Sequence, residues 1–239
     1  MAAGLLTRWL RRSRPQRLPT HEAYAIWAET YPPFPHNPLM RLEQSILAPM
    51  IADCSPHAAL DVGTGTGRYL PILYQAGATE VVGLDLSRAM LDRHATEARR
   101  VCADACALPF GCGRFDLVCS SLMAGDLDDL GAWVREAGRV LAPGGHLLYS
   151  DFHPEWSRHG WRRTFTAADG RALELSYVPH GIDDHLRHCD EAGLQVRTIR
   201  EPRLPGGSTH ALVILHLEKP RLGVGVPPGD ESRFPRTDL

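Results

Sequence analysis

From residue 58 onward, short unbroken apolar runs alternate with segments in which apolar residues recur at every third or fourth position. Such runs, rich in Val and Leu and bounded by turns, are typical of strands buried on both faces of a sheet. The runs fall at residues 58–62, 80–86, 100–105, 115–122 and 146–152. The helix-like segments between them are residues 69–76, 87–98 and 130–141. This alternation predicts repeated strand–helix units, and hence a parallel sheet covered by helices.

The pattern changes after the fifth run. Residues 154–180 carry large aromatic side chains around Asp169-Gly170, a dipeptide suited to a hairpin turn, which predicts an inserted β-ribbon or lid. The remaining predicted elements are a helix at 183–192 and two strands, at 195–201 and 211–218. The short connection between these strands favours an antiparallel pair at the sheet edge. We therefore expect a Rossmann-like, doubly wound α/β fold with a seven-stranded sheet, mostly parallel with an antiparallel edge strand.

The chain of 239 residues is long enough for one sizeable domain, which we place at residues 21–219. Residues 1–20 hold arginines and no acidic side chain, which predicts a basic, flexible extension. An amphipathic or transit-like targeting segment is the alternative there. Residues 220–239 are rich in Pro, Gly and charge and lack an apolar period, so we expect a disordered tail.

Composition narrows the classes of function. The formal net charge of -2 gives no overall positive field with which to hold nucleic acid. No apolar run approaches the ~20 residues that a bilayer-spanning helix needs. We expect a cytoplasmic protein with no nucleic-acid partner and no membrane span, and the sequence does not indicate an oligomeric state.

Six cysteines are present, but they form no C-x-x-C pair, which favours reduced thiols over a structural metal. His185, His188 and Cys189 have helical spacing, yet no second half of a ligand set accompanies them. We therefore expect no metal site.

The stretch LDVGTGTG, at residues 60–67, joins the first predicted strand to the first predicted helix. A dinucleotide-binding loop of the G-x-G-x-x-G type needs its third glycine at the position of Arg68. Asp61 would place negative charge beside a pyrophosphate, so a cationic ligand suits this loop better. Asp85 ends the next strand, where a carboxylate can accept both hydroxyls of a ribose. Asp104 ends the third, where it can accept from an exocyclic amine.

These motifs resemble those of the class I S-adenosylmethionine-dependent methyltransferases, in particular the group that includes quinone C-methyltransferases and malonyl carrier-protein O-methyltransferases. The resemblance covers residues 58–152 and rests on five stretches in order: LDVGTGTG, VVGLDLSRAML, CADACALPF, FDLVCSSL and RVLAPGGHLL. It implies an enzyme that transfers a methyl group from S-adenosyl-L-methionine to a small-molecule or carrier-protein-bound acceptor, with oxygen favoured over carbon as the accepting atom.

By this resemblance, Asp61 helps to anchor the methionine ammonium and Asp85 holds the ribose of the cofactor. The loop residues implied to contact the cofactor are Gly63, Thr64, Gly65 and Gly67. The residues implied to flank or read its adenine are Leu86, Met90, Asp104 and Ala105. The alternative for the glycines is a tight turn, and for the aspartates a helix cap or a solvated loop.

Asp151 and His153 are the candidates for acid–base chemistry, because they end the fifth predicted strand two residues apart. The carboxylate could orient the imidazole, as an acid–base pair requires. The alternative is that His153 only closes the strand before Pro154.

Tyr24 and Tyr31 recur at helical spacing before the first strand and could close over the cofactor as a lid, which is the role of such elements in this family. An ordinary amphipathic helix packed on the sheet is the alternative. The next candidates along the chain, for the acceptor side, are His36, Asn37 and Arg41.

The predicted ribbon also carries four arginines, Arg158, Arg162, Arg163 and Arg171. They could bind a carboxylate or a carrier-protein surface. We favour the alternative, in which they lie on a solvated face of the ribbon. Two other functions stay open at this point. One is a nicotinamide-dependent oxidoreductase with the same kind of sheet, although Arg68 argues against this function. The other is a catalytically inactive, cofactor-binding assembly protein.

Overall fold

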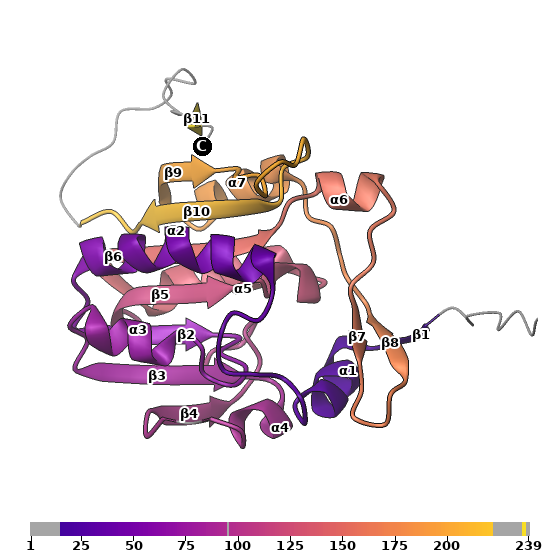
Figure 1. Cartoon of the computed structure of the whole chain (residues 1–239). Coiled ribbons are helices and arrows are strands. Elements are labelled where there is room, and N and C mark those ends of the chain that lie inside the picture. The colour runs from indigo at the N-terminus through magenta and orange to yellow at the C-terminus, as the bar shows by residue number, and fades with distance from the viewer. Residues whose placement is uncertain (1–14, 95, 222–235, 238–239) are drawn as a thin grey trace, which may run out of the picture.

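The computed structural model describes residues 15–94, 96–221 and 236–237. One sheet runs through the molecule in the order β11-β9-β10-β6-β5-β2-β3-β4 (Figure 1). In that order its strands are Arg236–Thr237, Gln195–Arg200, Leu212–Glu218, Leu141–Phe152, Phe115–Ser121, Ala58–Val62, Glu80–Asp85 and Arg99–Cys102. Strands β4, β3, β2, β5 and β6 pair in parallel, whereas β10 is antiparallel to both of its neighbours, β6 and β9. The predicted doubly wound sheet and its antiparallel hairpin are confirmed.

Chain order reverses between β2 and β5, because β3 and β4 lie on one side of β2 while β5 and β6 lie on the other. In open α/β sheets, ligands bind in the crevice outside the carboxyl ends of the strands at such a switch point. All five residues of β2 are buried, as the unbroken apolar run indicates. The fold thus places the loop after β2 at the centre of the expected binding edge.

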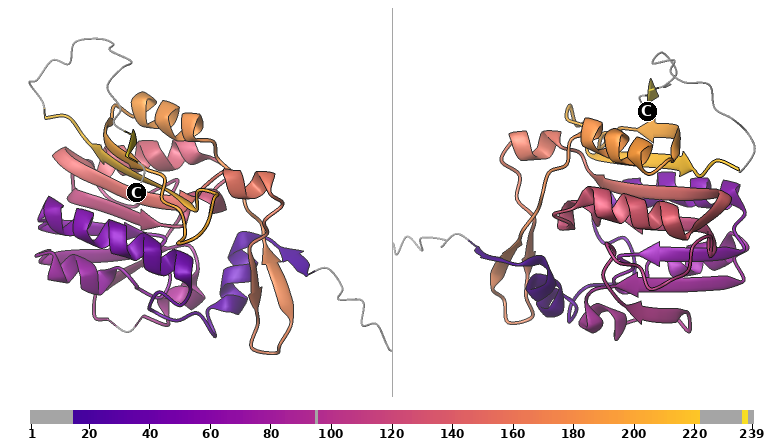
Figure 2. Two further views of the ribbon diagram at one scale, coloured as in Figure 1. Left: turned by 45° about the horizontal axis from the view of Figure 1, so that its top comes forward. Right: turned by 180° about the vertical axis from the view of Figure 1, so that it is seen from behind.

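Helices cover both faces of the sheet (Figure 2). The helices α2 (Pro38–Cys54) and α3 (Leu70–Gln75) pack on one face. The helices α5 (Leu130–Val140) and α7 (Ile182–Glu191) pack on the other. None of the helices in the described part of the chain is long and apolar enough to cross a membrane.

A smaller three-stranded sheet stands beside the main one (Figure 1). Its hairpin, β7 (Thr164–Thr166) and β8 (Ala172–Leu175), is the predicted ribbon and turns through Gly170 at a φ of 85°. Strand β1 (Gln16–Leu18) pairs in parallel with β8, and helix α1 (Thr20–Trp27) packs against the same ribbon. The prediction of a flexible extension at residues 1–20 does not hold for Gln16–Leu18, which pair with β8, and residues 1–14 lie outside the described residues.

Several element boundaries differ from the predicted ones. Helix α4 (Arg88–Leu91) is capped by Ser87, whose Oγ accepts from Met90 N at 3.3 Å, but it ends well before residue 98, where the predicted helix ends. Strand β6 begins directly where α5 ends, so Pro143-Gly144-Gly145 lies inside a strand. A short helix, α6 (Glu155–Arg158), precedes the ribbon. Most of the predicted tail at 220–239 lies outside the described residues, and Arg236–Thr237 pairs with β9.

Candidate functional site

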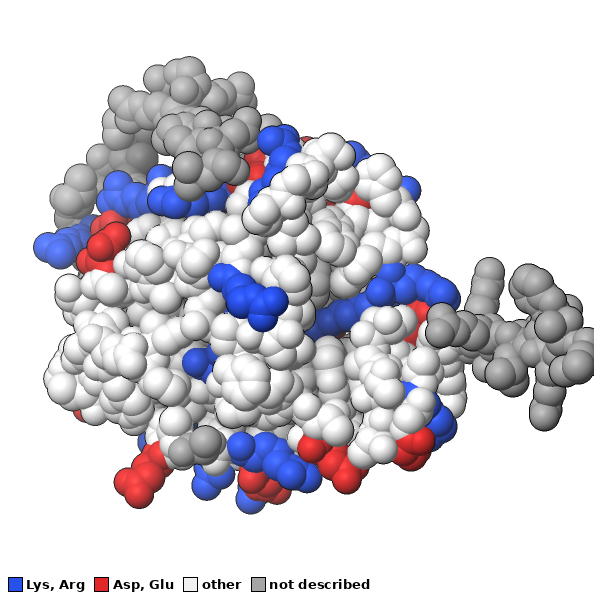
Figure 3. Space-filling model, viewed as in Figure 1, with Lys and Arg blue, Asp and Glu red and all other residues white. Residues whose placement is uncertain are grey.

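A cavity of about 470 Å³ opens at the carboxyl ends of β2, β3 and β5. Residues of α1 and the ribbon, among them Tyr24 and Arg163, line its outer side. On the face shown in Figure 3, basic side chains reach the surface along the junction between the ribbon and the main body. The cavity therefore lies at the predicted edge of the main sheet, between this sheet and the segment formed by α1 and the ribbon.

The glycine loop after β2 forms the floor of the cavity. Gly63, Gly65 and Gly67 have φ values of 70°, 57° and 89°, a region that side chains rarely adopt. The amides of Gly63 and Thr64 both donate to Leu84 O, at 2.8 and 3.0 Å, which fixes the loop to β3. Three of the four predicted loop residues, Gly63, Thr64 and Gly65, line the cavity.

Asp61 lies at the inner end of the cavity and is 2% exposed. Its Oδ1 accepts from the Cys119 thiol at 3.5 Å, whereas its Oδ2 has no hydrogen-bond partner among the described residues. Burial raises the pKa of this carboxyl to about 7. A buried carboxylate oxygen without a partner is costly, so the site favours a cationic donor from a ligand.

Asp85 is held beside the loop by two backbone amides. Its Oδ2 accepts from Gly65 N at 2.8 Å and its Oδ1 from Ser87 N at 2.7 Å. Burial raises the pKa of Asp85, although both amides act in the opposite direction. Each oxygen keeps a second lone pair, so the carboxylate can still accept from two neighbouring hydroxyls.

The rim beyond Asp85 is apolar. Leu86 is 60% exposed, which is unusual for a leucine, and Met90 is buried next to it. Both line the cavity, as do Asp104 and Ala105. Asp104 Oδ1 accepts from Cys106 N at 2.8 Å, which orients its carboxylate. An apolar surface next to hydrogen-bonding groups suits a flat ring with an amine at its edge.

His94 supports the glycine loop from behind, a role that the sequence did not indicate. Its Nε2 lies 2.8 Å from Gly65 O, and burial lowers its pKa. Gly67 faces the same ring: a Cβ on Gly67 would lie 3.4 Å from His94 and 3.1 Å from Leu70. Gly67 does not line the cavity, so the structure gives it a packing role in place of the predicted contact.

A buried ion pair explains why the third glycine of a dinucleotide loop is absent. Arg68 Nη1 lies 2.9 Å from Glu43 Oε2 on α2, and this carboxylate is fully buried. Glu43 also accepts from Tyr69, at 2.7 Å, and from Ser121 and Ser150, both at 2.8 Å. Arg68 also lines the cavity. Its hydrogen bonds join the glycine loop to α2 and to the end of β5.

A second buried hydrogen-bond network lies at the outer side of the cavity. Tyr24 Oη donates to Asp126 Oδ2 at 2.8 Å, and Arg163 Nη1 donates to Asp126 Oδ1 at 2.5 Å. Arg163 also donates to Tyr24 Oη. These residues belong to α1, to the 3₁₀ turn Ala124–Asp126 after β5 and to the start of the ribbon, and all three line the cavity. The lid is therefore tied to the main domain by charge-assisted hydrogen bonds.

Comparison with known proteins agrees with this geometry. A family model described as a methyltransferase domain matches residues 60–149. Over 139 residues the chain is 39% identical to a malonyl-[acyl-carrier protein] O-methyltransferase of Halorhodospira halophila, with 55% of this chain and 47% of the relative covered. These similarities support a class I S-adenosylmethionine-dependent methyltransferase domain at residues 60–149.

A second relative of this chain is a demethylmenaquinone methyltransferase of Thermus thermophilus, 38% identical over 108 residues, which cover 42% of this chain and 49% of the relative. The chain thus spans about half the length of both relatives. The N-methyltransferase NodS of Bradyrhizobium japonicum, solved with S-adenosyl-L-homocysteine, has the same fold: the TM-score is 0.64 at 14% identity, covering 85% of this chain and 100% of NodS. These relatives give no support to a nicotinamide-dependent oxidoreductase.

The cavity has chemistry that fits S-adenosyl-L-methionine, the cofactor that the resemblance implies. Asp61 presents an unpartnered, buried carboxylate oxygen, which suits the ammonium of a methionine moiety. The positive φ of Gly65 leaves open space on its Cβ side, so a ligand can approach the backbone closely. Tyr24 and Tyr31 line the cavity as predicted, and Tyr31 packs edge-to-face on Trp27 at 4.8 Å between ring centroids.

The remaining acceptor-side candidates lie elsewhere. Asn37 caps α2, with its side chain accepting from Met40 N at 2.8 Å. His36 packs against the Tyr31 ring, and Arg41 is exposed on α2. None of the three lines the cavity, so the structure does not place them at the acceptor.

The predicted pairing of Asp151 with His153 is wrong. Asp151 Oδ1 accepts from Phe152 N at 2.8 Å, and burial raises the pKa of this carboxyl to about 7. His153 Nε2 lies 3.0 Å from Glu201, and its Nδ1 accepts from Glu155 N at 3.2 Å. His153 lies one residue beyond the end of β6, where its N–H still donates to Ala211 O at 3.1 Å, and neither candidate lines the cavity.

The four ribbon arginines separate into two kinds, because Arg158, Arg162 and Arg171 are exposed whereas Arg163 is buried. Arg162 and Arg171 are about half exposed and pair with Glu174 and Asp169, as a solvated face predicts. Arg163 has an 8% exposed side chain and reaches the cavity. Sequence spacing could not single out Arg163, because burial depends on how the ribbon docks.

Proposed function

We propose that this methyltransferase transfers the methyl group of S-adenosyl-L-methionine to an oxygen atom of a small acidic acceptor, free or attached to a carrier protein. The observation that carries the cofactor assignment is the unpartnered, buried Oδ2 of Asp61 in a cavity beside Asp85. When bound, the cofactor supplies a methyl group already activated on a sulfonium. The residues of the chain then have to bind the cofactor and the acceptor, align them with each other and exclude water.

Each cofactor contact follows from the observed geometry. Asp61 would accept from the ammonium of the methionine moiety, and Asp85 would accept from the ribose hydroxyls. Leu86 and Met90 would flank the adenine. Its amine edge would lie toward Asp104 and Ala105, which line the same rim.

The acceptor side of the cavity favours an anion. Arg68 and Arg163 both line it and have 8% exposed side chains. Each is held in place by a buried carboxylate, yet a guanidinium has five N–H donors and keeps some for a ligand. A carboxylate acceptor is ionised at neutral pH, so its oxygen attacks without a general base. The absence of an Asp151–His153 pair is therefore compatible with transfer to oxygen.

The names of the relatives indicate two kinds of acceptor: a malonyl group on an acyl-carrier protein, and demethylmenaquinone. The second name does not state which atom is methylated. We favour the first kind of acceptor, because the carboxylate fits the two buried guanidinium groups. Arg163 belongs to the segment that lines the outer side of the cavity.

The test is methyl transfer from labelled S-adenosyl-L-methionine to malonyl-carrier protein and, separately, to a demethylated naphthoquinol, with products identified by mass spectrometry. We expect a base-labile methyl ester. Arg163→Gln should raise the KM for the acceptor at least about tenfold, because it removes one charged hydrogen bond. Arg162→Gln serves as the exposed control. A carbon-methylated quinone as the only product, or equal KM values for the two variants, would contradict the proposed acceptor.

A further inference from the structure

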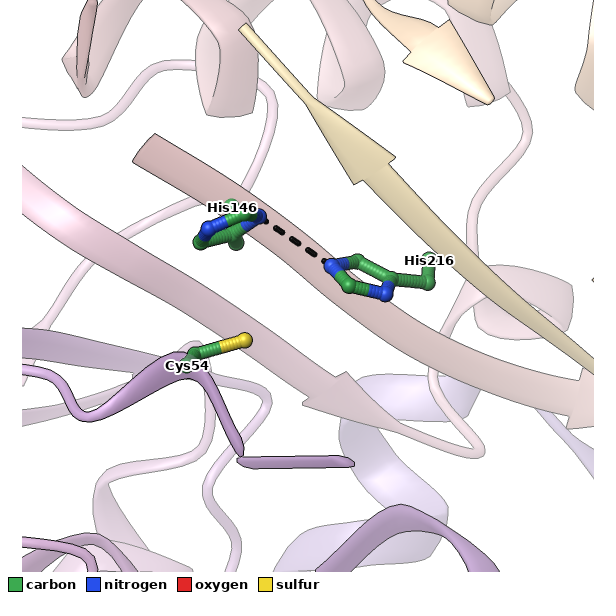
Figure 4. Close-up of side chains that lie close together, drawn as sticks. All are labelled: Cys54, His146 and His216. Atoms are coloured by element: carbon green, nitrogen blue, oxygen red, sulfur yellow. Dashed lines mark hydrogen bonds between the residues drawn. The ribbon is translucent and has the colours of Figure 1, made fainter. Parts of the chain in front are cut away.

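Figure 4 shows a cluster of metal-ligand side chains, none of which lines the methyl-transfer cavity. Cys54 is the last residue of α2, His146 lies in the amino-terminal half of β6, and His216 lies on β10. His216 pairs with Leu148 in the antiparallel register, so both histidines project from the same face of the sheet, the face that α2 covers. Three separate elements thus bring one thiol and two imidazoles together.

The distances suit a single ion. The ligand atoms of Cys54, His146 and His216 all lie within 4.8 Å of one another. His146 Nδ1 and His216 Nε2 are 3.1 Å apart. In a tetrahedral zinc site, bond lengths of about 2.0–2.3 Å place neighbouring ligand atoms roughly 3.3–3.6 Å apart. Closing the cluster on an ion therefore requires only a small movement of the half-buried Cys54 side chain.

The cluster has only weak internal partners. The Cys54 thiol donates to Met50 O of its own helix at 3.2 Å, and the two imidazoles bond to each other. In the hydrogen bond between the two rings one nitrogen must accept, so at least one imidazole already has the free lone pair that metal ligation requires. The thiol is soft and the imidazoles are borderline, a set typical of zinc.

A second group of this kind, His153, Glu201 and His210, differs in this respect. His153 uses both ring nitrogens, on Glu201 and on Glu155 N. His210 bonds to Glu155 through Nδ1 at 3.2 Å and to the Arg203 guanidinium through Nε2 at 2.6 Å. A bound cation would have to break this network and lie beside an arginine. We therefore interpret these residues as a hydrogen-bond network and not as a metal site.

We propose that Cys54, His146 and His216 bind a zinc ion, with the fourth position taken by water. Binding releases the thiol proton to solvent, and the hydrogen shared by the two imidazoles moves to the other nitrogen of its ring. The ion would join the carboxyl end of α2 to β6 and β10. Because α2 also carries Glu43, which holds Arg68 in the cavity, the ion would stabilise the support of the active site without taking part in methyl transfer.

The test uses the purified full chain, freed of metal by a chelator and titrated first with Co²⁺ and then with Zn²⁺. We expect one equivalent of Co²⁺ to bind with a thiolate-to-cobalt charge-transfer band and the visible bands of a tetrahedral ion, and Zn²⁺ to displace it. Cys54→Ser should abolish the charge-transfer band. His216→Gln should weaken binding by more than the roughly 100-fold that loss of an outer-shell partner causes. The matched control is Cys112→Ser, an exposed cysteine outside the cluster, which should leave the band unchanged.

Circular dichroism of each metal-free variant verifies its fold, and the wild-type titration is decisive even if one variant fails to fold. Failure of the wild-type chain to bind Co²⁺ would overturn the proposal. So would a charge-transfer band that persists in Cys54→Ser. Binding without any thiolate band, lost in His210→Ala, would place the ion at the other cluster and would equally contradict the assignment.

Discussion

The Asp85 carboxylate at the end of β3 accepts a hydrogen bond of 2.8 Å from the Gly65 amide in the loop after β2. One carboxylate thereby fixes the glycine loop and keeps further lone pairs directed at the cavity. The loop and the carboxylate that we propose to bind the ribose are consequently one structural unit, and a change in either should alter the affinity for the cofactor.

Asp85→Ala should weaken binding of S-adenosylhomocysteine by roughly 10- to 100-fold, because hydrogen bonds to a charged group contribute about 1.5–3 kcal/mol. His153→Ala should change the affinity by less than about threefold, since His153 lies outside the cavity and bonds to Glu201. Calorimetric titration of both variants measures the difference. Comparable affinities would contradict the assignment of Asp85 to the ribose.

Cofactor affinity should depend on pH through Asp61. Because burial raises its pKa to about 7, the cofactor-free protein takes up a proton as the pH falls through this value. The ammonium requires the ionised carboxylate, so affinity for S-adenosylhomocysteine should fall by up to about tenfold per pH unit below about 7. In Asp61→Asn this pH dependence should disappear.

Asp151→Asn is the matched control for that experiment. Burial raises the pKa of Asp151 to about 7 as well, but this residue does not line the cavity. The Asp151→Asn protein should keep the full pH dependence of binding. If Asp151→Asn flattens the profile and Asp61→Asn does not, the ammonium site has been assigned to the wrong carboxylate.

Glu43→Gln should destabilise the protein by about 3–5 kcal/mol, because it leaves the buried Arg68 guanidinium without its counterion. Glu80→Gln is the control: Glu80 pairs with Arg114 at the surface, where both side chains are about half exposed, and its loss should have little effect. Urea denaturation of the two variants compares their free energies of unfolding. Equal stabilities would mean that the Glu43–Arg68 pair does not support the fold.

Gly125→Ala should disturb the docking of the ribbon. A Cβ at Gly125 would lie 2.7 Å from Tyr177 Cδ2 and 3.0 Å from Asp151 Oδ2, and overpacking of this kind costs about 1–3 kcal/mol. Gly111→Ala, where a Cβ meets nothing within 4 Å, is the control and should be nearly neutral. Thermal unfolding distinguishes the two, and a Gly125→Ala protein as stable as Gly111→Ala would show that Tyr177 moves aside freely.

The sequence predicted the features that depend on local pattern. The five parallel strands follow from short apolar runs, and the loop after β2 follows from glycines that adopt positive φ. Asp61, Asp85 and Asp104 could be placed together because parallel strands end at the same edge of a sheet. For these residues, position along the chain already determines position in space.

The supporting residues could not be predicted, because their partners are distant in the sequence. Glu43 lies 107 residues from Ser150 and Arg163 lies 139 residues from Tyr24, so no local spacing connects them. His94 fell in a segment predicted to be helical, whereas α4 ends at Leu91. The Asp151–His153 hypothesis failed for the same reason, since the partner of His153 is on the loop after β9.

Calorimetric titration of the purified protein with S-adenosylhomocysteine and, separately, with NADH tests the central claim most directly. The geometry around Asp61 and Asp85 predicts micromolar binding of S-adenosylhomocysteine and none of NADH. Binding of NADH alone would contradict the assignment of the glycine loop, and with it the proposed methyl transfer.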